Sequence, residues 1–101
     1  MRIFLSSISR IIYLVRKRNI VGARVKQARR QAKPPITQLD LMARLQVLGV
    51  RIDQSAISKI ESGHRPVSDI EVAALAKALK VPAAWLLKDT DSLSGKSVSP
   101  A

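Results

Sequence analysis

The chain has 101 residues, of which 47% are apolar, and this length fits one small domain. It contains 18 Lys and Arg residues against 7 Asp and Glu residues, and the net charge of +11 favours an anionic partner, either nucleic acid or a lipid surface. Cysteine is absent, which excludes disulfides, thiolate zinc sites and a cysteine nucleophile. His64 is the only histidine, which excludes a His-rich metal site and argues against a Ser-His-Asp triad. We therefore expect neither a cofactor nor an enzyme.

The basic residues are concentrated near the start of the chain. Residues 1–36 contain ten Lys and Arg residues and no acidic residue. Residues 37–101 contain the other eight basic residues and all seven acidic ones, which leaves a net charge of +1 there. Any phosphate-binding surface should therefore include the N-terminal third of the chain.

Residues 1–19 form an apolar and basic segment that we interpret as a flexible or weakly helical extension. Its apolar side chains recur at roughly helical spacing, at Phe4, Ile8, Ile11, Ile12 and Val15. Because Arg10 interrupts the run, it is shorter than the roughly 20 apolar residues of a membrane span, and no signal-peptide cleavage site follows it. Two alternatives stay open: residues 1–18 form a membrane-surface helix, or they form a packing or dimer element.

From residue 20 the sequence predicts five short helices, in a domain that ends at residue 88. The first covers about 21–32, because apolar residues share one helical face at Val21, Val25, Ala28 and Ala32. The opposite side is basic and is interpreted first as a solvated surface, at Arg24, Lys26, Arg30 and Lys33. Pro34-Pro35 ends this helix, since proline disfavours helical geometry in the residue before it.

The next two helices have clear start and stop signals. Thr37 is the predicted N-cap of the second helix and Gly49 its C-terminal stop. Its apolar face comprises Leu41, Leu45 and Leu48. Asp53 is the predicted N-cap of the third helix, residues 54–62, which Gly63 ends. The inward residues of this third helix are Ala56, Ile57 and Ile60.

Ser68 opens the fourth helix with a Ser-x-x-Glu capping box through Glu71. The apolar face of this helix comprises Ile70, Ala74, Leu75, Ala78 and Leu79. Val81-Pro82 separates it from a last short helix at 84–87, in which Trp85 is interpreted as a plug of the core or of a dimer interface. The serine-rich residues 89–101 are predicted to form a flexible tail.

The second and third helices, with the glycine-bearing turn between them, predict a helix-turn-helix. The outward face of the third helix presents short or bidentate polar side chains with little negative charge: Gln54, Ser55, Ser58 and Lys59. Gln can pair with adenine, Ser with several bases and Lys with guanine, and the N-terminal part of such a helix enters the major groove. We interpret these residues as base-reading, with an ordinary solvated face as the alternative.

At this point the sequence resembles the lambda-repressor-like, XRE-type helix-turn-helix family over residues 22–87. The matching segments are GARVKQAR at 22–29, ITQ at 36–38, ISKIESG at 57–63, ALAKAL at 74–79, and Val81 with Leu86-Leu87. The resemblance implies an all-α, compact five-helix DNA-binding domain, here with an N-terminal extension and a short disordered C-terminal tail. It also implies a cytoplasmic, nucleoid-associated homodimer that binds a palindromic operator in double-stranded DNA.

The resemblance also implies roles for single residues. The base-reading positions correspond to Gln54, Ser55, Ser58 and Lys59. The phosphate-contacting positions correspond to Thr37 and Gln38 at the start of the second helix, and to His64 and Arg65 in the loop after the third. A structural ion pair between the first and third helices corresponds to Arg29 and Glu61.

The sequence departs from the family pattern in three places. The segment between the second and third helices is about five residues longer, with Gln46 to Val50 as the insertion, so it either extends the helix or lengthens the turn. Met42 stands where a small residue is typical, and Lys80 where a glycine is usual. Arg44 and Arg51 would approach DNA only if the longer turn faced it.

Three functions of different classes follow from these observations. The first is a sequence-specific DNA-binding transcriptional regulator that acts as a repressor. The second is the antitoxin of a toxin–antitoxin pair, which would bind its own promoter and, through the tail or the extension, a protein toxin. The third is a membrane-surface protein anchored by residues 1–18. RNA binding lacks support, because Phe4 and Tyr13 lie outside the domain and leave it no aromatic stacking pair.

Overall fold

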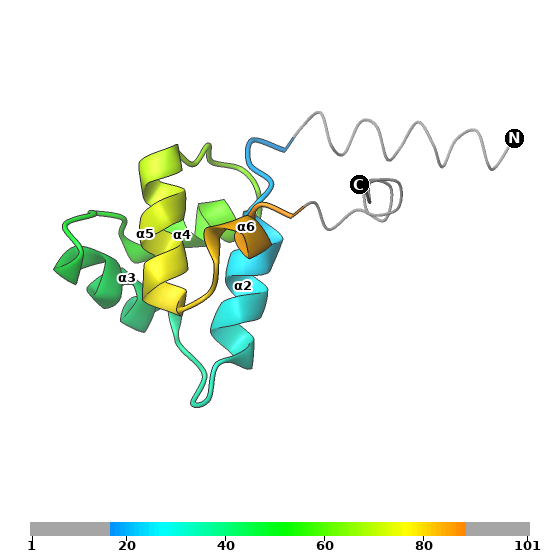
Figure 1. Cartoon of the computed structure of the whole chain (residues 1–101). Helices are drawn as coiled ribbons and strands as arrows, with labels where there is room; N and C mark the ends of the chain where they lie inside the picture. The colour runs from blue at the N-terminus through cyan, green and yellow to red at the C-terminus, as the bar shows by residue number, and fades with distance from the viewer. Residues whose placement is uncertain (1–16, 89–101) are drawn as a thin grey trace, which may run out of the picture.

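The computed structural model describes residues 17–88, so the predictions for residues 1–16 and for the tail at 89–101 lie outside the described residues. Between residues 17 and 88 the chain forms five helices and no strand, which confirms the predicted all-α class (Figure 1). The helices are α2 (Gly22–Gln31), α3 (Gln38–Val47), α4 (Gln54–Glu61), α5 (Asp69–Leu79) and α6 (Ala83–Leu86). Their ends lie within about one residue of the expected ones, as is usual for helix termini.

The helices enclose one small aliphatic core. α4 packs against α2 and α3, α5 packs against α2 and α3, and α6 covers α5 and α2 (Figure 1). Every helix contributes at least one side chain with no exposed surface: Val25, Leu41, Leu45, Ile57, Ile60, Leu75 and Leu86. Full burial of one such side chain stabilises the fold by about 1.5–3 kcal/mol. Because two of these residues belong to α4, the rotation of α4 about its own axis is fixed by the core.

Two glycines end α3 and α4 with the same backbone closure. Gly49 has φ 84° and Gly63 has φ 81°, the left-handed region that glycine adopts without a steric cost. The residue after each glycine donates its N–H to a carbonyl five residues earlier: Val50 to Leu45 at 2.9 Å, and His64 to Lys59 at 2.9 Å. The two predicted stops are therefore confirmed, and each one redirects the chain sharply.

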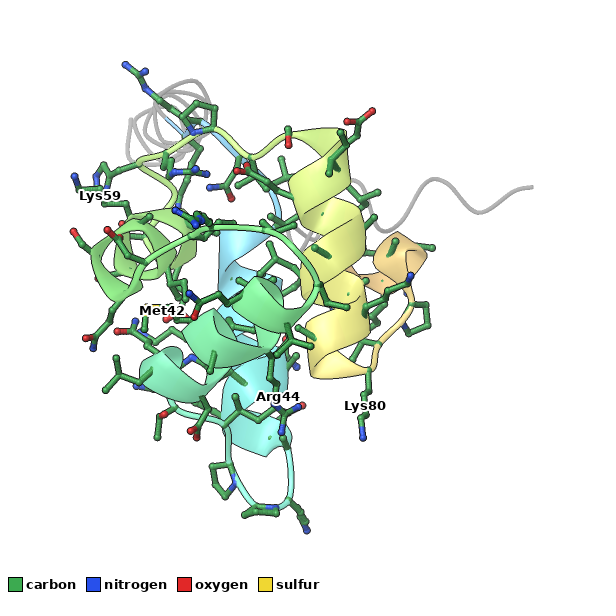
Figure 2. The ribbon with its side chains drawn as sticks, turned by 90° about the vertical axis from the view of Figure 1, so that its left-hand side faces the viewer. Met42, Arg44, Lys59 and Lys80 are labelled. Carbon is green, nitrogen blue, oxygen red and sulfur yellow. The ribbon has the colours of Figure 1, made fainter. Side chains whose placement is uncertain are left out.

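The longer segment between α3 and α4 is divided between the helix and the turn. α3 continues to Val47, Leu48 caps it, and residues 50–53 lead extended into α4. Val47 is 86% exposed, so the extra turn of α3 projects beyond the core. Met42 is half-buried against the core and, with Gln46 and residues 50–53, borders a surface depression of about 410 Å³ (Figure 2).

Lys80 ends α5 in the left-handed conformation, with φ 58°. A residue with a Cβ pays about 1–2 kcal/mol for this geometry, which is why glycine is usual at such a position. The Val81 N–H still donates to the Ala76 carbonyl at 3.0 Å, so the helix end is closed as it would be with glycine. Lys80 therefore adopts the backbone conformation that glycine usually has at this position of the family.

Candidate nucleic-acid interface

The outward face of α4 presents the four side chains that the sequence predicted to read bases. Gln54, Ser55, Ser58 and Lys59 are all exposed, while Ile57 and Ile60 are fully buried on the opposite side. The cause is the helical period, which places the residues at 57 and 60 inward and those at 55, 58 and 59 outward. Lys59 projects from the domain at the edge opposite Lys80 (Figure 2).

The start of α4 is fixed by the predicted N-cap. The Asp53 carboxylate accepts a hydrogen bond from the Ala56 backbone N–H at 2.8 Å. Such a cap stabilises a helix by about 1 kcal/mol. The cap also connects the first turn of α4, which contains Gln54 and Ser55, to Asp53 at the end of the α3–α4 connection. The backbone that carries these two side chains is therefore fixed.

A bidentate ion pair between Arg29 and Glu61 joins α2 to α4. The Nε of Arg29 lies 2.7 Å from Oε2 of Glu61, and its Nη2 lies 3.0 Å from Oε1. Its Nη1 donates to the Ile36 carbonyl at 3.0 Å, which adds the segment before α3. The two side chains are only 12% and 5% exposed, and the hydrogen bonds that Arg29 donates to Glu61 raise the pKa of Arg29 above its usual value. The pair therefore holds α4 in place at its inner side.

Gln38 extends this network to the outward face. Its Nε2 donates to Oε1 of Glu61 at 3.1 Å, and its Oε1 accepts a hydrogen bond from Nε2 of Gln54 at 3.4 Å. The structure thus brings together one residue that was predicted to contact phosphate and one that was predicted to read a base. Both amides are oriented by a chain of contacts that begins at the buried ion pair.

Thr37 and Asp40 form a capping box at the start of α3. The Thr37 hydroxyl accepts from the Asp40 N–H at 3.0 Å, and the Asp40 carboxylate accepts from the Thr37 N–H at 3.1 Å. The hydrogen bonds from Thr37 hold the pKa of Asp40 below its usual value. The sequence signal for this box is the Thr-x-x-Asp spacing of residues 37–40, and only its first half, the cap at Thr37, was predicted.

The loop after α4 separates its two predicted phosphate ligands. His64 is exposed, and its Nδ1 lies 2.7 Å from the Ser62 hydroxyl. Arg65 instead forms two hydrogen bonds of 3.1 Å with the Glu71 carboxylate on α5, which raise the pKa of Arg65 and lower that of Glu71. Since its charge is already balanced by Glu71, Arg65 is the weaker candidate of the two for a phosphate.

Residues 17–19 are bonded to the end of α4, which sequence reasoning missed. The Asn19 amide donates to the carbonyls of Ile60 at 3.1 Å and Arg65 at 2.7 Å, and its Oδ1 accepts from the Gly22 N–H at 2.7 Å. The Arg18 N–H donates to the Gly63 carbonyl at 2.8 Å. The available signal was the Asn-x-x-Gly spacing before α2, since Asn is a strong helix-capping residue.

Two arginines make contacts that the sequence did not predict. Arg24, interpreted as part of a solvated face, stacks its guanidinium over the Trp85 ring at 4.7 Å from the ring centre, and its Nε is buried. That interpretation is corrected, because long cationic side chains lie along apolar neighbours. Arg44 donates to the Ala78 carbonyl at 2.9 Å, at the end of α5 near Lys80 (Figure 2). Its approach to DNA stays a conditional prediction.

Between residues 17 and 88 no helix is long and apolar enough to cross a bilayer. Over the same residues, acidic and histidine side chains do not gather in a group of three or more that could hold a metal ion. The candidate site is the exposed polar face of α4, which includes Lys59, with the start of α3 and the loop after α4.

The comparisons with known proteins agree with this geometry. No curated protein and no solved structure matched the chain. A family model described as helix-turn-helix, HTH_3, matches residues 25–86, which covers all of α3, α4 and α5 and the outward face described above. The chain therefore belongs to the HTH_3 helix-turn-helix family, the XRE-type, lambda-repressor-like domains that bind DNA.

Proposed function

We propose that this protein is a sequence-specific transcriptional repressor that reads the major groove of DNA with α4. The observation that carries the proposal is the outward face of α4, where four exposed polar side chains stand on a helix whose inner side is fixed by the Arg29–Glu61 pair. Reading a sequence requires donors and acceptors on a backbone with a defined position. The Arg29–Glu61 pair supports such a position for α4, and the Gln54 amide is also hydrogen-bonded to Gln38.

The four side chains match the chemistry of base edges. A Gln amide can donate to and accept from adenine, a Ser hydroxyl can do either with several bases, and a Lys ammonium donates to the N7 and O6 of guanine. Gln54 and Ser55 belong to the first turn of α4, which is the part of a recognition helix that reaches the bases. Ser58 and Lys59 follow one turn later and would meet the edges of the next base pairs.

Phosphate contacts on either side would set the docking angle. At the start of α3, Thr37 and Gln38 lie at a helix N-terminus, whose positive dipole end attracts anions, and the Asp40 carboxylate of the capping box shares this end. After α4, the His64 side chain is exposed and is the second candidate for a phosphate contact. We expect the smaller contribution from Arg65, because its guanidinium is paired with Glu71.

We further propose that two copies bind a palindromic operator, with half-sites about one helical turn of DNA, roughly 34–36 Å, apart. Four base-reading side chains specify only a few base pairs, so two copies of α4 are needed for a site that is rare in a genome. Occupation of a promoter by such a dimer would block transcription. The proposal includes no catalytic step.

The test is a pull-down of genomic DNA fragments by the purified full chain near physiological salt, followed by sequencing. We expect enrichment of a short palindrome by the wild type and loss of that enrichment in a Ser58→Ala, Lys59→Ala double variant. Lys80→Ala is the control, since it removes one exposed cation at the opposite edge of the domain (Figure 2). Uniform recovery of all fragments by the wild type would refute sequence-specific recognition.

A further inference from the structure

A short basic segment lies beside the end of α4. We call it the lead-in segment and define it as Lys17, Arg18 and Asn19. This segment precedes the residues matched by the family model, which begin at residue 25. In Figure 1 it runs beside the loop that joins α4 to α5. Hydrogen bonds from both its backbone and its side chains set its position.

Four hydrogen bonds fasten the lead-in segment to the end of α4. The Arg18 N–H donates to the Gly63 carbonyl at 2.8 Å, and Lys17 Nζ reaches the Ser62 carbonyl at 3.3 Å. Asn19 donates to the Ile60 and Arg65 carbonyls at 3.1 and 2.7 Å. Because these acceptors lie at the negative end of the α4 dipole, a basic segment is also favoured there electrostatically.

The fastening brings the charges of the segment next to those of the predicted interface. The His64 N–H donates to the Lys59 carbonyl at 2.9 Å, and the preceding residue, Gly63, accepts from Arg18. Two consecutive backbone contacts therefore connect a predicted base-reading residue, a predicted phosphate ligand and the exposed Arg18. Two carboxylates near this turn, Glu61 and Glu71, are already ion-paired with other arginines, Arg29 and Arg65.

In the proposed docking of α4, its length would bring this cluster near the DNA backbone. α4 has eight residues, which is about 12 Å of helix, and the major groove is about 12 Å wide. A helix whose first turn touches base edges therefore has its last turn at the height of the phosphates. An exposed group fastened to that last turn is then within reach of a phosphate oxygen, and a guanidinium binds one well because it offers a planar pair of donors.

We infer that the lead-in segment is a phosphate clamp: Arg18, held by its backbone bond to Gly63, contacts a DNA phosphate at the flank of the base-reading face, beyond the α3 and α4 contacts. The inference rests on the proposed docking of α4. Asn19 is a positioning residue in it, because it acts through the carbonyls of α4 and of the loop and not on DNA.

The experiment measures the affinity of the full chain for a 30-base-pair duplex between about 50 and 300 mM KCl. The variants are Arg18→Gln, which keeps the backbone bond to Gly63, and Arg18→Lys, which keeps the charge. Lys80→Gln is the matched control, as it removes one exposed charge at the opposite edge of the domain (Figure 2). The duplex is either the operator from the pull-down or, if none is found, a random sequence.

For Arg18→Gln we expect the slope of log Kd against log salt to fall by about 1, together with a three- to tenfold loss of affinity near 100 mM salt. Arg18→Lys should restore most of the slope, and Lys80→Gln should leave it unchanged. Equal slopes for Arg18→Gln and Lys80→Gln would overturn the clamp. Absence of any sequence preference in the wild-type pull-down would instead overturn the proposed function. Since the salt slope can be measured on any duplex, failure of the clamp and failure of the proposed function are distinguishable.

Discussion

Gly22→Ala tests a close approach between α2 and α4. Gly22 is the first residue of α2, and a Cβ built on it would overlap the Ile60 carbonyl oxygen of α4. Ordinary contacts of this kind begin at 3.4 Å, so the two backbones would have to separate. The neighbour is backbone rather than the tip of a side chain, and it therefore has no cheap way to move.

Two effects of opposite sign compete in this variant. Alanine gains about 0.5–1 kcal/mol over glycine inside a helix through its lower conformational entropy in the unfolded chain. Forcing an extra carbon into a packed contact costs about 1–3 kcal/mol or more, and here the shift also stretches the 3.1 Å hydrogen bond from Asn19 to the Ile60 carbonyl. We expect the clash to dominate, with a net loss of about 2 kcal/mol.

The assay is urea and thermal unfolding, followed by the fluorescence of Trp85, the only tryptophan of the chain. A loss of 2 kcal/mol should lower the Tm of a domain of this size by about 8–16 °C. Ala23→Gly, at the next and exposed residue, measures the local helix propensity, and Gly49→Ala measures the cost of a positive φ where nothing lies within 4 Å. A Gly22→Ala variant as stable as the wild type would show that the helices are not in this contact.

Three further predictions concern stability. Glu61→Ala should destabilise the domain by about 3 kcal/mol, measured by urea unfolding, because it leaves the largely buried Arg29 guanidinium without its counter-charge; a loss below 1 kcal/mol would mean that the pair is effectively solvated. Lys80→Gly should raise stability by about 1 kcal/mol, since glycine adopts φ 58° without strain, and a lower Tm would contradict this. The hydrogen bonds from Arg65 lower the folded pKa of Glu71, so its stabilisation is complete above the unfolded pKa, about 4.3, and is lost as the pH falls through the folded pKa. Glu71→Gln should therefore flatten the acid side of the stability curve below about pH 5, and an unchanged acid limb in unfolding at stepped pH would exclude this contribution.

Local signals in the sequence were sufficient for the elements of the fold. The caps at Thr37, Asp53 and Ser68 and the stops at Gly49 and Gly63 depend on neighbours within a few residues, and the structure has them all. The apolar period predicted most of the buried faces, but two residues assigned to them are wrong: Leu48 is 42% exposed and Ile70 is 71% exposed, because each lies at the rim of its helical face. The outward position of the predicted base-reading residues followed from the same period, because burial of one helical face leaves the other exposed. Which bases they meet depends on the docking angle, so that assignment stays a prediction.

Only the tertiary structure decided which side chains meet across long stretches of chain. Asn19 and Ile60 are 41 residues apart, and Arg44 and Ala78 are 34 apart. No periodic pattern encodes such contacts, because they arise when helices pack and bring a long polar side chain within reach of a helix end. The family pattern anticipated the Arg29–Glu61 pair, but only packing shows that Gln38 and Gln54 join it. Local patterns in the sequence thus determined the helices. The packing of the helices determined the polar network beside the candidate DNA-reading face, because that network joins residues far apart in the chain.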